Sequence, residues 1–184
     1  MAQLTTLAHA FLAARAARFA WLDKLCAVAP AHDGDYEPLR LIREALACYL
    51  DGYIMAANLT TAAHVEHTLV EELRRRGFVP VKASPILHGA IASASANKLF
   101  ADPEVLEKID HLRQVRNPLT HRKVDGHKHS VMRRSRAPKR APELILEDDA
   151  PLGLEVTHGL FFASLRPFKA PTVPDVAASS EGQS

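Results

Sequence analysis

Apolar side chains recur at intervals of three and four residues along most of this 184-residue chain. That spacing places them on one face of an α-helix, whereas a half-buried strand would show strict alternation. Pro30, Gly52 and Gly77 interrupt the pattern, and Asp102-Pro103 is a typical helix start. Helices are therefore predicted over residues 3–28, 36–50, 53–76 and 86–100, from residue 103 onward, and over residues 152–165.

The predicted fold is an all-α bundle of about five or six helices. A hydrophobic fraction of 47% is enough for a core, and an aromatic fraction of 6% favours helix over sheet. We expect an N-terminal helical extension over residues 1–30, a helical domain over 36–167 with a basic loop at 122–142, and a disordered tail over 168–184. The long alanine-rich helices could also pack against a second copy of the chain.

Two charged residues interrupt apolar seams of the predicted helices. Arg116 continues the seam of Val105, Ile109 and Leu112, and Glu66 interrupts the seam of an earlier helix. A charge that faces a core or an interface is costly unless it has a partner. The two residues could form a structural salt bridge, or Glu66 could orient Arg116 or His121 at a functional site inside or between bundles.

Arg116, Asn117 and His121 lie close together in the sequence at the end of the predicted helix. An arginine can bind a phosphate through two parallel N–H donors, and a histidine transfers protons near neutral pH. Together they could cleave an RNA backbone without a metal ion. The spacing alone is unspecific, but Pro118 is predicted to kink or restart the helix with Asn117 as the new N-cap, which could bring His121 toward Arg116.

Positive charge is concentrated just after this motif. Residues 122–140 contain eight Lys or Arg and one Asp, whereas the whole chain has a formal net charge of +2. Such a segment suits a phosphate backbone, although without an aromatic residue it is not expected to stack on bases. The alternative is a solvated loop. The predicted RNA-binding residues are Arg122, Lys123, Lys128, Arg133, Arg134 and Arg136.

The segments CYLDGYIMAANLTTAAHVEHTLVEELRRRG and DPEVLEKIDHLRQVRNPLTH resemble a HEPN domain. That family is a compact helical bundle, usually a homodimer, whose hallmark is an arginine, a polar residue and then a histidine. Arg116-Asn117 and His121, with four residues between the arginine and the histidine, fit the short form of the motif. The resemblance covers about residues 36–165.

The resemblance implies a metal-independent endoribonuclease, often a toxin or a phage-defence effector, in which the motifs of two subunits meet. Arg116 would bind the scissile phosphate, His121 would act as general acid or base, and Asn117 would position one of them or the RNA. The products would carry 2′,3′-cyclic phosphate and 5′-hydroxyl ends. In one toxin branch the antitoxin modifies a tyrosine two residues after the histidine; Lys123 stands there, so that form of control is not expected.

Two other interpretations stay open. The first is a non-catalytic HEPN module that binds RNA, a nucleotide or a partner protein. The second is a metal site of His64, Glu66 and His67, for which the sequence offers no further ligands, so no metal is expected. Cys26 and Cys48 lack metal or redox spacing.

No phosphate-cradling glycine-rich loop occurs in the sequence, and we expect no cofactor. There is also no secretory signal pattern and no apolar run of membrane-spanning length, so a cytoplasmic location without membrane contact is expected. The expected partners are RNA, a second copy of the chain, and an antitoxin or other regulatory protein.

Overall fold

The computed structural model describes residues 2–26, 36–78, 87–120, 127–136 and 138–164. This part of the chain contains seven helices and no strand. They are α1 (Ala2–Leu25), α2 (Tyr36–Leu50), α3 (Ile54–Arg75), α4 (Leu87–Ala96), α5 (Pro103–Thr120), α6 (Val131–Arg136) and α7 (Pro142–Ser164). The all-α prediction is confirmed.

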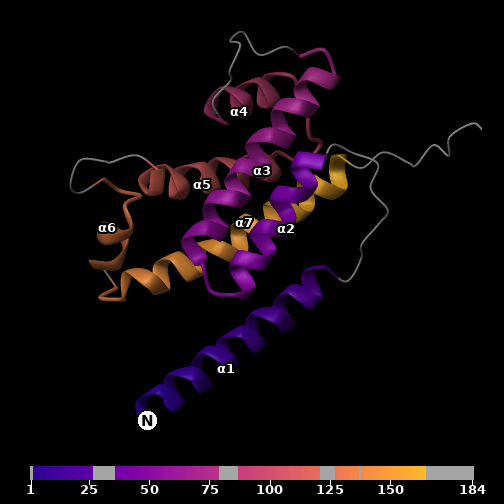
Figure 1. Cartoon of the computed structure of the whole chain (residues 1–184). Helices are drawn as coiled ribbons and strands as arrows, with labels where there is room; N and C mark the ends of the chain where they lie inside the picture. Colours follow the sequence, from indigo (N-terminus) through magenta and orange to yellow (C-terminus); the bar gives the residue numbers. More distant parts are fainter. Residues whose placement is uncertain (1, 27–35, 79–86, 121–126, 137, 165–184) are drawn as a thin grey trace, which may run out of the picture.

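Helix α3 runs through the middle of the bundle, with α2, α4, α5 and α7 packed around it (Figure 1). Its buried positions recur at intervals of three and four residues, as the sequence pattern predicts. Leu69 and Leu73 of α3 meet Ile109 and Leu112 of α5 and Leu160 of α7 in the larger apolar cluster. This packing fixes the position of α5, which carries the arginine of the motif.

A second apolar cluster joins the C-terminal parts of α1 and α2 to the start of α3 and the first half of α7. Leu22 of α1, Tyr49 of α2 and Leu154 of α7 are buried together, and Trp21 packs edge-on against Tyr49 with 5.5 Å between ring centroids. Only the C-terminal part of α1 takes part in this cluster, while the rest of the helix extends away from the bundle (Figure 1).

Two helix boundaries follow the predicted capping residues. At the end of α3, Gly77 has a φ of +77°, and the Phe78 N–H donates to the Leu73 carbonyl at 2.9 Å. This closed turn favours glycine, because a side chain is strained at positive φ. At the start of α5, Asp102 Oδ1 accepts a 2.9 Å hydrogen bond from the Glu104 N–H, as expected for an N-cap.

The structure differs from the sequence prediction at two prolines. Helix α5 continues through Pro118 to Thr120, so Asn117 is not a new N-cap. Pro118 cannot donate the backbone hydrogen bond to residue 114, and the helix continues for only two residues beyond it. Helix α7 begins at Pro142 rather than at residue 152, and includes Pro151.

Packing explains why α7 tolerates an internal proline. Ile145, Ala150 and Leu154, on both sides of Pro151, are all buried. Burial of this face outweighs the roughly 3 kcal/mol that an interior proline costs a helix.

The predicted basic loop at 122–142 also contains a helix, α6, so the described bundle has seven helices rather than five or six. Ser130 Oγ accepts a 3.3 Å hydrogen bond from the Arg133 N–H at the start of α6. The predicted tail at 168–184 lies outside the described residues. None of the described helices is both long and apolar enough to cross a membrane.

Candidate nucleic-acid interface

Arg116 and Asn117 lie in the last turns of α5, and both side chains are half-buried. His121 comes directly after the end of α5 and lies outside the described residues, as do Arg122 and Lys123. The structure therefore places Arg116 and Asn117 of the predicted motif, and the roles of all three motif residues stay predictions.

Arg116 has no partner for its Nε atom within the described part of the chain, although that atom is shielded from solvent. Leu112, one turn earlier, is fully buried, so the arginine continues the apolar seam as the sequence predicts. A buried donor without an acceptor costs about 1–3 kcal/mol. The contacts of the described residues therefore give the Arg116 Nε atom no stabilising role.

Glu66 does not neutralise Arg116. Both residues are described, and no ion pair joins them. The salt bridge that the sequence allowed is thus absent, and among the described residues no carboxylate pairs with the Arg116 guanidinium. The half-buried Glu66 stays a candidate for orienting another group of the site.

Helices α5 and α7 run in opposite directions against α3 (Figure 1). They meet at Gly153, where a Cβ atom would lie 3.3 Å from Leu112 Cδ1 of α5 and 2.7 Å from Thr61 Oγ1 of α3. Because the two helices are antiparallel, Arg116, one turn after Leu112, and Asp149, one turn before Gly153, lie toward the same end of the helix pair.

Asp149 fixes the basic helix α6 at this end of the bundle. Its side chain is 7% exposed and accepts two hydrogen bonds from Arg134, at 2.7 and 2.5 Å. These hydrogen bonds raise the pKa of Arg134 despite its burial. The charge of Arg134 is therefore already balanced, and its predicted role in RNA binding stays a prediction.

The other described cations of the segment face solvent. Lys128, Arg133 and Arg136 are exposed. In the sequence, Lys128 comes before Arg134 and Arg136 comes after it, and Arg134 itself is paired with Asp149. The three exposed cations provide positive charge beside the end of α5, as a contact surface for a phosphate backbone requires.

Two histidines to which the sequence pattern assigned no role lie in the segment of the chain that connects α5 to α6. The rings of His127 and His129 are 5.7 Å apart. Burial lowers the pKa of His129, and the nearby charges of Lys128, His127, His111 and Arg134 lower it further. His129 is therefore mostly neutral at pH 7. In the sequence, only the order His-Lys-His within a basic segment could have indicated this histidine pair.

The alternative interpretation of the sequence was a metal site that includes His64 and His67. The structure gives these histidines the environments of ordinary structural residues. His64 is 1% exposed, its Nδ1 lies 3.1 Å from the Pro38 carbonyl, and its Nε2 lies 3.3 Å from Thr68 Oγ1. His67 is exposed. Among the described residues, no group of three metal-ligating side chains is close enough to hold an ion.

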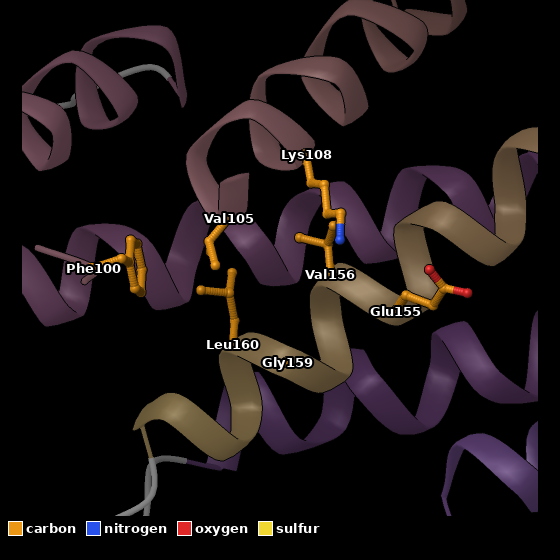
Figure 2. A pocket seen from close by; sticks show the side chains of 7 residues that line it. All are labelled: Phe100, Val105, Lys108, Glu155, Val156, Gly159 and Leu160. Atoms are coloured by element: carbon orange, nitrogen blue, oxygen red, sulfur yellow. The ribbon is translucent and has the colours of Figure 1, made fainter. Parts of the chain in front are cut away.

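A small apolar cavity of about 190 Å³ opens at the other end of α5 (Figure 2). Phe100, Val105 and Leu160 form much of its lining, with Lys108 and Glu155 at its edge. The cavity lies near the first turns of α5, two turns or more before Arg116, and is not part of the candidate interface.

Comparison with known proteins identifies no relative: no family model, no curated protein and no solved structure matches the chain. The resemblance to HEPN domains therefore rests on the motif and on the order of the helices.

Proposed function

We propose that this protein is a HEPN-type, metal-independent endoribonuclease. The observation that carries the proposal is Arg116, a half-buried guanidinium with no carboxylate partner among the described residues, at the end of a helix beside exposed cations. An unneutralised arginine is suited to bind a phosphate with two N–H donors. The motif histidine, His121, follows five residues later in the sequence.

The reaction is an internal transfer of the phosphoryl group. The 2′-oxygen of the RNA attacks the adjacent phosphorus and loses its proton to a base, while the bond from phosphorus to the 5′-oxygen breaks and that oxygen gains a proton. Arg116 stabilises the negative charge that grows on the phosphate oxygens, and His121 transfers one of the two protons. The products carry 2′,3′-cyclic phosphate and 5′-hydroxyl ends.

The remaining site residues act through these two. Asn117, next to Arg116 in the last turns of α5, positions the arginine or the RNA, and Glu66 orients His121. Lys128, Arg133 and Arg136 bind the RNA backbone with little preference for sequence, because phosphate contacts carry no base information. Cleavage by such a site fits a toxin or phage-defence effector that is held in check by an antitoxin or other regulatory protein.

A non-catalytic RNA-binding module is the second candidate. The exposed cations of α6 favour it, because they would bind a phosphate backbone with or without an active histidine. In that case RNA binds but is not cut.

The test is incubation of end-labelled RNA with the purified protein in EDTA, with analysis of the product ends. The wild type should release cyclic-phosphate ends, His121→Ala should release none, and the control His67→Ala, at an exposed histidine of α3, should cleave like the wild type. Equal cleavage by His121→Ala, or binding of RNA without cleavage by the wild type, would overturn the nuclease proposal.

A further inference from the structure

The cavity near the first turns of α5 is a candidate binding site that the proposed reaction does not use (Figure 2). Its lining is mostly apolar. Val156 and Leu160 of α7 are buried in the larger core cluster, and the half-buried Phe100 and Val105 pack against that cluster. An apolar cavity of about 150 Å³ is large enough for a benzene ring, so the volume of about 190 Å³ suits one ring with a short chain.

Gly159 leaves the α7 side of the cavity open. At 3.6 residues per turn, the cavity-lining residues of α7 lie within an arc of about 140°, and Gly159 lies inside that arc, about 40° from Glu155 and about 60° from Val156. No described atom lies within 4 Å of a Cβ atom built on Gly159. A side chain at this position would therefore point into the opening of the cavity.

The two charged side chains at the edge of the cavity differ in their partners. Lys108 forms a 2.9 Å ion pair with Glu104, one turn earlier on α5. Glu155 of α7 has no ion pair within the described part of the chain. Glu104 raises the pKa of Lys108, and Glu155 and Asp102 raise it further, so three carboxylates act on one ammonium group. The charge that is left without a partner at this edge is therefore negative.

We propose that this cavity binds a small organic cation, in which a primary ammonium group is joined through a short chain to one apolar ring. The ring would lie beside Val105 and Leu160, and the ammonium group would stay at the edge beside the Glu155 carboxylate. Burial of the ring drives binding, whereas the unpaired carboxylate favours a cation over an anion. Because the cavity and Arg116 lie at opposite ends of α5, the inference does not depend on ribonuclease activity.

The test is a titration of the isotope-labelled full chain, followed by NMR, with three probes that share a phenethyl group. They are phenethylammonium, the neutral phenethyl alcohol, and the anion phenylpropionate. At pH 7 the wild type should bind phenethylammonium at least about fivefold more tightly than phenylpropionate, with the alcohol between them, because the charge at the edge is exposed but of one sign.

Substitutions in the chain locate the site. Gly159→Leu fills the opening and should abolish binding of all three probes. Gly89→Leu adds the same side chain on α4, where the space around the glycine is also open, and should bind like the wild type. Glu155→Gln should weaken binding of phenethylammonium by about two- to fivefold and leave binding of the alcohol unchanged. The three replaced residues are exposed, so circular dichroism should show the same helical signal in every variant.

Binding of phenethylammonium that persists in Gly159→Leu would overturn the proposal, because the probe would then occupy another site. Equal affinities for the cation and the anion, or an unchanged affinity for the cation in Glu155→Gln, would do so as well, since the carboxylate would then not select the ligand. A wild type that shows no binding of phenethylammonium at millimolar concentration would also overturn it.

Discussion

Arg116 and Arg134 lie toward the same end of the bundle and have opposite surroundings. Arg134 is bound to a buried carboxylate through two hydrogen bonds, whereas Arg116 has a shielded Nε without an acceptor in the described residues. The sequence predicted that Arg116 continues an apolar seam. It could not predict which arginine is neutralised, because Asp149 and Arg134 meet only through the packing of α6 on α7.

Loss of the Arg134–Asp149 pair should destabilise the fold. Arg134→Ala leaves the buried Asp149 carboxylate without its partner, so the free energy of unfolding should fall by about 3 kcal/mol. Urea denaturation followed by circular dichroism measures the change. The matched control is Arg140→Ala, whose pair with Asp148 is exposed on both sides and should contribute much less. Equal losses in both variants would contradict this account.

Glu72 should make stability depend on pH on the acid side. Burial opposes its ionisation, but hydrogen bonds from Arg75 and Arg76 outweigh burial and lower its pKa. The ionised residue therefore stabilises the fold above its ordinary pKa of 4.5, and this contribution is lost as the pH falls through the lower pKa of the folded state.

Glu72→Gln should lower the free energy of unfolding at pH 7, measured by urea denaturation, by no more than about 1 kcal/mol because both arginines are exposed. The difference from the wild type should shrink as the pH falls below 4.5. Glu71→Gln removes the same charge from a residue with no ion pair among the described contacts, and its midpoint should follow the wild type at every pH. If the stability lost in Glu72→Gln stays constant with pH, the ionisation of Glu72 does not contribute to the pH dependence of stability.

At the scale of helices, the apolar pattern predicted α2 over residues 36–50 and the core face of α3 correctly, because each helix packs one apolar face on several neighbouring helices. The prolines predicted the ends of the helices less accurately. A proline raises the cost of a helix locally, but whether the helix ends there depends on the surface that its neighbours bury. Pro151 is tolerated because α7 packs on α2 and α3 on both sides of it, a long-range contact that no local pattern reveals.

Gly153 sets the distance between α7 and the helices that it crosses. In Gly153→Ala the new Cβ would lie 2.7 Å from Thr61 Oγ1, so the helices must move apart and stability should fall by about 1–3 kcal/mol. Thermal or urea unfolding measures the loss. Gly159→Ala is the control on the same helix, with nothing within 4 Å of the added atom, and should be neutral or slightly stabilising. If Gly153→Ala leaves the stability unchanged, the contact between Gly153 and Thr61 is not tight.

At the scale of the whole molecule, the helical bundle and the position of its motif arginine followed from the sequence, but the surfaces did not. The N-terminal part of α1 has the composition of a core helix, and only the structure shows that it exposes Leu7, Phe11, Leu12 and Phe19 outside the bundle. Likewise, the basic segment gave no sign that Asp149 fixes part of it as a helix beside the end of α5. Both surfaces depend on which helices meet, and this is decided by tertiary packing.

The most direct test of the ribonuclease account is the single-turnover cleavage rate of Arg116→Ala, measured beside its urea midpoint. We predict a rate at least about 100-fold below that of the wild type, because the phosphate loses its charged donor. The urea midpoint should be unchanged or higher, since the variant removes a shielded donor that has no acceptor among the described residues. Arg113→Ala, on the same helix but paired with Asp110, should cleave at the wild-type rate. Wild-type cleavage by Arg116→Ala, or a variant that is inactive because it unfolds, would contradict the account.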